Sequence, residues 1–444
     1  MCFRIPPCST APWIWFLIVI GLLSLGSSAG LANEAPRKPN VVFIVADDLG
    51  TADLNCFGSK DLLTPHLDAL AMRGTKFTQF YVGAPICSPS RAAFFTGRCP
   101  QRAGLVTNSG VTGMPAEQYT LGELFRDAGY RTALFGKWHL GHSNDGDDPL
   151  GQGFQEFMGH LGGCIDNYSH YFFWHGPNRH DLWRNRTEIF EEGRYFPDMM
   201  VQDAKRFLAA NATKPFFLCL TTNLPHYPLQ PDRKFLEAYA KIPNENRRRY
   251  GPFVSTMDDR IGKVLDEIDR LGLRDDTIVV FFSDHGHSTE ERTFGGGGSA
   301  GGYRGHKGTL WEGGIRVPCI ISWPGHLPEG ATCDRIATAM DLFPTLAELC
   351  GIPLPQRRLD GKSIAALLSG ADKDSPHHTL HWKFGNAWAV REGDWKIVQH
   401  AQEPVLTNMS TDPFEQINLA KKHPEIVARL TALNEEWLKT CEEQ

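Results

Sequence analysis

Two segments of this chain, residues 40–46 and 277–283, are runs that consist mainly of apolar residues. Runs of this length that are rich in β-branched residues predict strands buried on both faces. Each run is followed directly by polar side chains: Asp47 and Asp48 after the first, Asp284 and His285 after the second. The sequence therefore predicts two acidic clusters at the carboxyl ends of two buried strands.

Other segments show the spacing of helices. Residues 120–123 form a capping box for a helix that Gly129 would end. From about Gly251 to Leu271, apolar residues recur every three or four positions, which predicts a long amphipathic helix. Further strands are expected at residues 131–135, 215–220 and 317–322. Because strands alternate with helices, we predict an α/β fold with a mostly parallel central sheet flanked by helices, and ligands bound at the carboxyl ends of the strands.

The pattern changes after about Ser369. Residues 387–390 and 395–398 are short alternating segments, and residues 424–440 have the character of a terminal helix. We therefore expect residues 371–444 to form a small C-terminal α+β subdomain that carries a short antiparallel sheet.

The first residues have the layout of a secretory signal peptide. Arg4 precedes the apolar residues 13–20, and the small residues 27–32 provide a cleavage site. The apolar stretch is shorter than the roughly 20 residues that span a bilayer. We expect residues 1–32 to be removed and the mature chain to be exported without stable membrane insertion. Its location would be periplasmic or secreted, or lysosomal or extracellular in a eukaryote.

A candidate nucleophile lies in the motif Cys87-Ser88-Pro89-Ser90-Arg91. The apolar residues 92–95 follow it, so Cys87 is expected at the N-terminus of a helix. The positive end of a helix lowers the pKa of a thiol and attracts anions. Taken alone, the motif is also compatible with a structural cysteine of an exported protein.

The expected convergence of Asp47, Asp48 and Asp284 indicates a cation site. Like charges at one sheet edge repel one another unless a cation neutralises them, and a hard divalent ion suits carboxylate ligands. The alternative is that these are ordinary turn or capping acids. The formal net charge of −6 excludes a general nucleic-acid binder, which would carry a basic excess.

The motif at Cys87, with Thr96-Gly97 after it, resembles the signature of the formylglycine-dependent sulfatases of the alkaline phosphatase superfamily. The similarity is closest to the arylsulfatase and N-acetylgalactosamine-6-sulfatase branch. Matching segments occur in the same order along the chain: the two acidic clusters, residues 129–139, residues 224–228 and residues 304–318. The resemblance implies an alkaline-phosphatase-like sheet, with residues 33–370 as the catalytic domain.

The resemblance also implies the roles of individual residues. A maturation enzyme would oxidise Cys87 to formylglycine, and Ca²⁺, or Mg²⁺ in its place, would bind to Asp47, Asp48, Asp284 and His285. Because Ca²⁺ prefers oxygen ligands, His285 could instead hydrogen-bond the substrate or the nucleophile. The remaining implied catalytic residues are Arg91, Lys137, His139, His226 and Lys307. Ser169 and His170 are implied substrate contacts, with an ordinary polar loop as the alternative.

The implied activity is hydrolysis of a sulfate monoester, on a sulfated carbohydrate or an aryl sulfate. Two alternatives remain open on the same fold. One is a phosphomonoester or phosphonate ester hydrolase, which would usually carry Ser or Thr as nucleophile and two zinc ions. The other is a non-catalytic glycan-binding relative, which would be expected to lack some of the implied catalytic residues.

Overall fold

A computed structural model describes residues 38–108, 113–142, 146–174, 176–400 and 403–442. The predicted signal peptide, residues 1–32, lies outside this part of the chain, and so do residues 33–37 and 443–444 at the outer ends of the two predicted domains. The boundary predicted at residues 370/371 stays a prediction.

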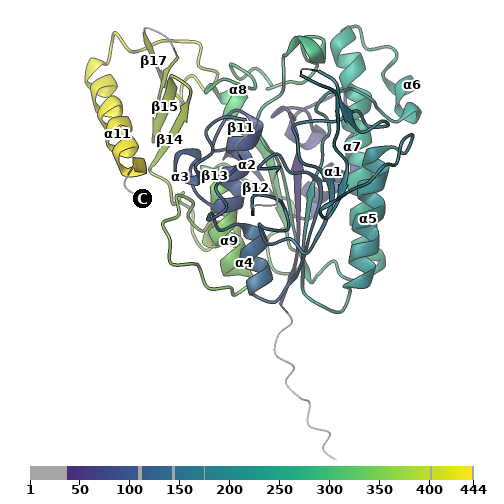
Figure 1. Ribbon diagram of the computed structural model, residues 1–444. Coiled ribbons are helices and arrows are strands. Elements are labelled where there is room, and N and C mark those ends of the chain that lie inside the picture. The colour runs from purple at the N-terminus through teal and green to yellow at the C-terminus, as the bar shows by residue number, and fades with distance from the viewer. Residues whose placement is uncertain (1–37, 109–112, 143–145, 175, 401–402, 443–444) are drawn as a thin grey trace, which may run out of the picture. The chain divides into compact units, whose positions relative to one another are not determined.

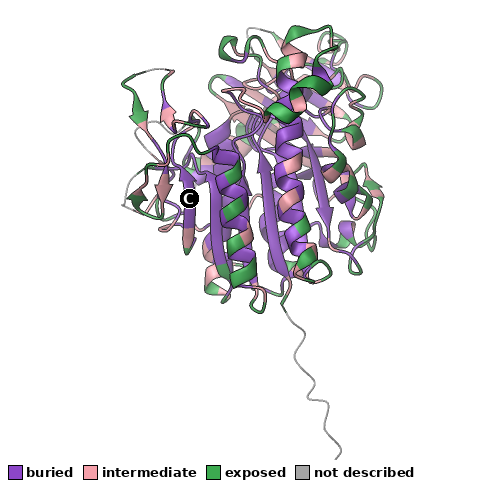
Figure 2. Ribbon diagram, turned by 90° about the vertical axis from the view of Figure 1, so that its right-hand side faces the viewer, coloured by how far each residue is buried: buried purple, intermediate pink, exposed green. Residues whose placement is uncertain are grey.

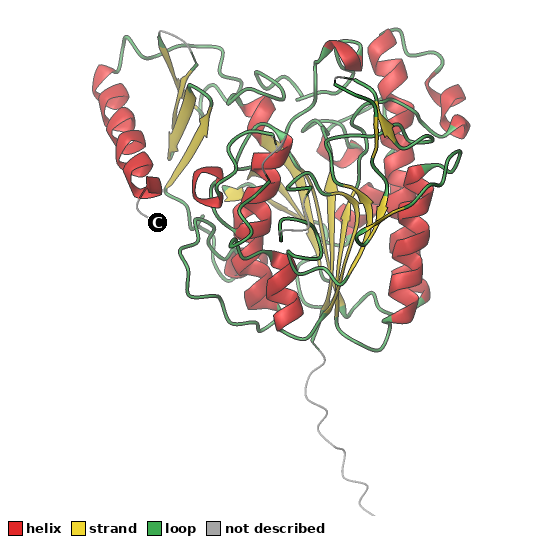
Figure 3. Ribbon diagram, in the orientation of Figure 1, coloured by secondary structure: helices red, strands yellow, loops and turns green. Residues whose placement is uncertain are grey.

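The predicted mostly parallel central sheet is confirmed (Figures 1 and 3). Its strand order is β12 (Ala331–Cys333), β2 (Thr75–Tyr81), β11 (Arg316–Ser322), β10 (Thr277–Ser283), β1 (Asn40–Ala46), β9 (Phe216–Thr221), β3 (Arg131–Lys137), β4 (Glu156–His160), β7 (Trp183–Arg184) and β8 (Thr187–Glu188), with β13 (Ala337–Thr338) beside β2. The run from β10 to β4 is parallel throughout. β11, β7 and β8 add antiparallel pairs on either side of it. The carboxyl ends of the parallel strands therefore meet at one edge.

Strand β1 lies between two hydrophobic cores because its side chains alternate between the faces of the sheet. Val41, Phe43 and Val45 pack into one core, and Val42, Ile44 and Ala46 into the other. All of them are fully buried, as are the central strands in general (Figure 2). The predictions of doubly buried strands at residues 40–46 and 277–283 are confirmed.

Helices cover both faces of the sheet. α1 (Pro65–Met72), α5 (Phe196–Ala210) and α7 (Glu245–Arg270) pack into one core, and α2 (Cys87–Thr96), α4 (Leu121–Asp127) and α9 (Leu342–Leu349) into the other. Shorter helices are α3 (Pro100–Ala103), α6 (Leu236–Tyr239), α8 (Glu312–Ile315) and α10 (Ala365–Leu368), with 3-10 turns at Asn55–Phe57, Arg233–Phe235, Glu291–Thr293 and Ala339–Asp341. We find no helix in the described ranges with both the length and the apolar character that a bilayer crossing requires.

Two helix starts show how local sequence sets these elements. The predicted capping box is present: the Thr120 side chain accepts from the backbone N–H of Glu123, and the Glu123 carboxylate accepts from the N–H of Thr120. Helix α7 begins at Glu245 rather than near Gly251, because the Asn244 side chain accepts from the N–H of Arg247 at 2.9 Å and caps an earlier turn.

The predicted C-terminal antiparallel sheet is also confirmed. It consists of β14 (Thr379–Phe384), β15 (Ala387–Glu392), β16 (Trp395–Gln399) and β17 (Pro404–Asn408), and α11 (Pro424–Glu442) packs on it. Lys396 on β16 joins this sheet to the main core, because its buried ammonium contacts Glu312 of α8 at 2.8 Å and Glu415 at 2.9 Å. A charged group this deep is stable only when it is paired.

Replacing Lys396 with Met leaves two buried carboxylates without their shared cation. We expect Lys396→Met to lower the free energy of unfolding by about 3–5 kcal/mol, measured by urea denaturation. The matched control is Lys383→Met on β14, a partly exposed lysine without an ion pair in the described part of the chain. A loss below about 1 kcal/mol in Lys396→Met would contradict the role given to this network.

Candidate active site

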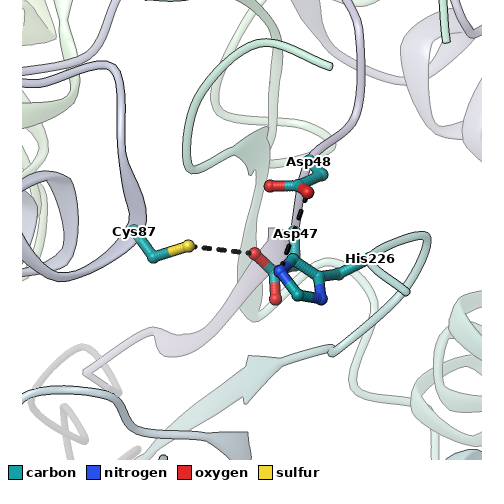
Figure 4. Close-up of side chains that lie close together, drawn as sticks. All are labelled: Asp47, Asp48, Cys87 and His226. Atoms are coloured by element: carbon teal, nitrogen blue, oxygen red, sulfur yellow. Dashed lines mark hydrogen bonds and ion pairs between the residues drawn. The ribbon is translucent and has the colours of Figure 1, made fainter. Parts of the chain in front are cut away.

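The candidate site lies at the carboxyl edge of the parallel strands. The side chains come from separate elements: Asp47 and Asp48 follow β1, Asp284 and His285 follow β10, Lys137 ends β3, His226 lies beyond β9, and Cys87 begins α2. In Figure 4, Cys87 points from its helix toward Asp47, while the His226 ring lies beside Asp47 and faces Asp48. The structure thus brings together residues that are far apart in the sequence.

Cys87 is the first residue of α2 and is almost completely buried. Its Sγ lies 3.3 Å from His285 Nε2 and 3.8 Å from Asp47 Oδ1. Burial by itself would raise the pKa of this thiol, but the charges of Lys137 and Lys307 outweigh it and lower the pKa to about 6. The site therefore stabilises negative charge on the side chain at position 87.

Two buried cations tie the helix to the strand ends. Arg91, one turn after Cys87, donates from Nε and Nη2 to Asp284 Oδ2 at 3.2 and 3.0 Å and from Nη1 to the Lys137 carbonyl at 2.9 Å. Lys137 Nζ donates to Asp47 Oδ2 at 2.7 Å. These bonds occupy both side chains, so they fix the position of α2 relative to β1, β3 and β10.

The acidic cluster fits a divalent cation. Burial raises the pKa of Asp48 to about 7 and that of Asp284 to about 6, although nearby cations oppose it. Asp48 Oδ1 is buried and accepts no hydrogen bond from the described part of the chain. Oxygens of Asp47 and Asp284, Cys87 Sγ and a ring nitrogen of His285 all lie within 4.8 Å of one another. A hard cation would neutralise the buried carboxylates of this cluster.

His285 is part of this cluster. Its Nδ1 lies 3.0 Å from the Gly286 carbonyl, and its Nε2 lies 3.3 Å from Asp48 Oδ1 and 3.5 Å from Asp284 Oδ1. Burial would lower the pKa of His285, but the negative charges of Asp284 and its neighbours raise the pKa to about 10. The surrounding groups therefore stabilise positive charge at this point.

His139, His226 and Lys307 line the cavity that opens onto Cys87. Burial, reinforced by Lys137, holds the pKa of His139 well below its usual range, and burial does the same for His226. Both imidazoles are therefore neutral near pH 7. Lys307 Nζ contacts Asp48 Oδ2 at 3.0 Å, which holds the lysine charged against the cost of burial and keeps its pKa raised.

The cavity has a volume of about 270 Å³. Its lining consists of Cys87, Asn108, His139, Gly163, Cys164, Phe172, Arg179, His226, Tyr227, Arg292 and Lys307. Ser169 and His170 are not among these residues. The Ser169 hydroxyl donates to Asp166 Oδ1 at 3.0 Å, and His170 Nε2 lies 3.0 Å from the Arg194 carbonyl. Their substrate contacts stay a prediction.

Sequence reasoning missed several residues of the site. Asn108 Oδ1 accepts from the Ser88 backbone N–H at 3.2 Å, and Glu290 Oε2 lies 3.2 Å from Lys307 Nζ. Arg179 and Arg292 also line the cavity. These residues lie in irregular or very short segments, and no local pattern around them marks a function.

An activated side chain, fixed positive charge and a cluster that could hold a cation lie at one sheet edge, and this arrangement suits a hydrolase of anionic esters, because each part would stabilise charge that such a reaction develops. A family model described as Sulfatase matches residues 39–352, and one described as N-sulphoglucosamine sulphohydrolase, C-terminal, matches residues 302–441. The chain belongs to the sulfatase family, and it is an arylsulfatase-like enzyme. The predicted resemblance is confirmed.

Relatives match over most of the chain. Arylsulfatase A from Homo sapiens is 34% identical over 470 residues, which cover 93% of this chain and 89% of the relative. N-acetylgalactosamine-6-sulfatase from Homo sapiens is 32% identical over 463 residues, with coverages of 90% and 86%. The crystal structure of Ps i-CgsB has a TM-score of 0.83 at 31% identity, covers 90% of this chain and 93% of its own, and is also known in complex with k-i-k-neocarrahexaose.

The lowered pKa of Cys87 can be tested in protein that retains the thiol and has been treated with a chelator. We expect alkylation of Cys87 by iodoacetamide, followed by peptide mass spectrometry, to be half-maximal near pH 6. Lys137→Met removes a charge that lowers this pKa, so the half-maximal rate moves to higher pH. The buried Cys219, whose pKa burial raises, is the internal control and reacts slowly throughout. An unchanged profile in Lys137→Met would contradict the electrostatic assignment.

Proposed function

We propose that this sulfatase hydrolyses a sulfate monoester of a carbohydrate, with a hydrated formylglycine derived from Cys87 as the nucleophile. The observation that carries the proposal is the position of Cys87, at the N-terminus of α2 and within the field of Lys137 and Lys307. The partner this requires is a maturation enzyme that oxidises the cysteine. No nucleic acid is involved.

Oxidation of Cys87 solves a problem of product release. A thiol that attacked sulfur would leave a sulfated enzyme without an internal route for expelling sulfate. In the hydrated aldehyde, one hydroxyl oxygen bonds to sulfur as the ester oxygen leaves with a proton, and loss of the second hydroxyl's proton re-forms the aldehyde and releases sulfate. The site residues therefore have to hold an anion, protonate or stabilise the leaving oxygen and remove one proton.

The charged residues divide these tasks by position. Lys307 lines the cavity and remains charged, so it stabilises the leaving oxygen or the sulfate oxygens, and His226 lies beside it. His139 is neutral and lines the same cavity, which suits it to accept the proton of the second hydroxyl. Arg91 is a positioning residue, because its donors are directed to Asp284 and the Lys137 carbonyl.

Ca²⁺, with Mg²⁺ as the alternative, would be held by Asp47, Asp48, Asp284 and His285. The ion would supply positive charge that polarises a sulfate oxygen. Asp284 would also assist deprotonation of the attacking hydroxyl, since burial gives it a pKa of about 6. The proposed fit rests on the buried carboxylates and on Asp48 Oδ1, which has no hydrogen-bond partner among the described residues.

A carbohydrate substrate is supported by two observations. The relatives include an N-acetylgalactosamine-6-sulfatase, and Ps i-CgsB is known with a bound carrahexaose. The cavity wall contains Phe172 and Tyr227, and aromatic rings of this kind can contact sugar rings. We further propose that the protein is exported after removal of residues 1–32.

Activity should depend on position 87 alone among the free cysteines of the core. We expect Cys87→Ala, and wild-type protein produced without the maturation enzyme, to hydrolyse 4-nitrophenyl sulfate at the uncatalysed rate. The control is Cys319→Ala, which removes a buried thiol on β11 and retains activity. Full turnover by Cys87→Ala or by the unoxidised wild-type protein would overturn the mechanism. Faster cleavage of 4-nitrophenyl phosphate than of 4-nitrophenyl sulfate by the mature enzyme would favour the phosphoesterase alternative.

Metal removal should affect stability as well as activity. A cation whose free concentration is 100 times its dissociation constant adds about 2.7 kcal/mol to the free energy of unfolding. We therefore expect chelation to abolish turnover and to lower the melting temperature, with recovery on addition of Ca²⁺. Because Cys87→Ala retains the carboxylates, it should show the same thermal shift. Identical melting with and without chelator in both proteins would remove the metal from the proposal.

A further inference from the structure

Arg179 is a cation of the substrate cavity that the mechanism does not use. It belongs to the short strand β6 (Arg179–His180), outside every motif that the sequence shares with sulfatases, and it lines the same cavity as Cys87, His139 and Lys307. Its guanidinium makes no hydrogen bond and no ion pair with any side chain in the described part of the chain. Its recorded contact is with the Phe172 ring, 4.9 Å from the guanidinium carbon to the ring centroid.

The other cations of the site all have carboxylate partners. Lys137 pairs with Asp47, and Arg91 with Asp284. Lys307 pairs with Asp48 and Glu290, and Arg292 also pairs with Glu290. These pairs offset most of the positive charge before a substrate binds, whereas the charge of Arg179 is not offset in this way.

Asp181, two residues further along, forms no ion pair with Arg179 among the described residues, although Asp181 Oδ2 and Arg179 Nη2 both lie beside Gly162. The Asp181 carboxylate is buried and accepts the backbone N–H groups of Leu161 and Gly162, at 3.0 and 2.8 Å, and the Trp183 indole N–H at 2.9 Å. These bonds hold Asp181 toward the backbone of the β4–β7 region. Arg179 therefore keeps an available, fork-shaped set of donors at the cavity wall.

The position of Arg179 is set by the two-stranded sheet that carries it. Arg179 lies opposite Phe172 in the pairing of β6 with β5 (Tyr171–Phe172). Phe172 is buried and packs with Cys164, Tyr227 and Trp174. The cation-π contact restricts the guanidinium to this wall, which lowers the entropy cost of binding an anion there.

We propose that Arg179 determines substrate specificity by binding a second anionic group, a sulfate or a carboxylate, of the same saccharide whose sulfate ester reacts with the nucleophile at residue 87. The inference rests on the proposed function and narrows it to multiply charged saccharides. A bidentate guanidinium–oxyanion pair matches both candidate groups. A monoanionic aryl sulfate has no group that would use it.

The test compares substrates within each protein variant, so that differences in folding or maturation cancel. The substrates are 4-nitrophenyl sulfate, a disaccharide with one sulfate and no other charge, and the same disaccharide with a second sulfate or with a uronate carboxylate. Selectivity is the ratio of kcat/KM for each doubly charged disaccharide to that for the singly charged one. Comparing the two doubly charged disaccharides shows whether Arg179 prefers a sulfate or a carboxylate as the second anionic group.

We expect wild-type enzyme to favour at least one doubly charged disaccharide, and Arg179→Gln to reduce that ratio about tenfold or more, mainly through KM. Arg179→Lys keeps the positive charge but lacks the paired donors of the guanidinium, so we expect its selectivity ratio to lie between those of Arg179→Gln and the wild-type enzyme. The matched control is Arg131→Gln, an exposed arginine at the opposite end of the strand that Lys137 ends, and it leaves the ratio unchanged.

The outcomes separate the two proposals. If mature wild-type enzyme cleaves none of the sulfate esters, the proposed function itself fails. If it cleaves them without preferring a second charge, or if Arg179→Gln and Arg179→Lys both keep the wild-type ratio, the specificity role is wrong while the sulfatase mechanism stands. Melting temperatures of both variants close to that of wild type would establish that a lost ratio is not caused by unfolding.

Discussion

The structure depends on the stable burial of many charges at one sheet edge. Asp47, Asp48 and Asp284 are almost completely inaccessible to solvent, and so are Arg91 and Lys137. Removing an ion from water costs several kcal/mol, and this cost is offset only when opposite charges lie at hydrogen-bond distance. The 2.7 Å contact between Lys137 and Asp47 and the paired contacts of Arg91 with Asp284 meet this condition. The hydrophobic strands bring the groups together, and charge pairing then fixes their geometry.

A second buried network supports the same edge from the C-terminal sheet. Glu312 at the start of α8 accepts from Lys396 and Arg316, and its backbone N–H donates to Glu415 at 2.7 Å. The loop that carries Lys307 leads directly into α8, and the Gly313 N–H donates to the Arg304 carbonyl within that loop. The C-terminal sheet therefore supports the cavity indirectly, because it holds the segment that positions Lys307.

Under the proposed function, different cations of the cavity take part in the reaction and in recognition of the substrate. Lys137 and Lys307, the cations beside Cys87, are bound to carboxylates, so their geometry is fixed before a substrate enters, as electrostatic preorganisation requires. Arg179 and the aromatic wall around Phe172 belong to a short, separate sheet beside this machinery. In such an arrangement, substitutions in β5 and β6 can change the range of substrates without disturbing the buried ion pairs.

The sequence by itself determined the elements whose signals are local. Apolar runs marked β1 and β10, the Thr120 capping box marked α4, and the order of motifs placed Cys87, Lys137 and the acidic residues at one edge. Only the tertiary structure decided which charges are partnered: that Arg91 is occupied by Asp284, that Glu290 contacts Lys307, and that Arg179 lines the cavity without an ion pair to any described residue. The physical reason is that hydrophobic periodicity is a property of neighbouring residues, whereas ion pairing depends on contacts between segments far apart in the chain: Arg91 and Asp284 are separated by 193 residues, and Asp48 and Lys307 by 259.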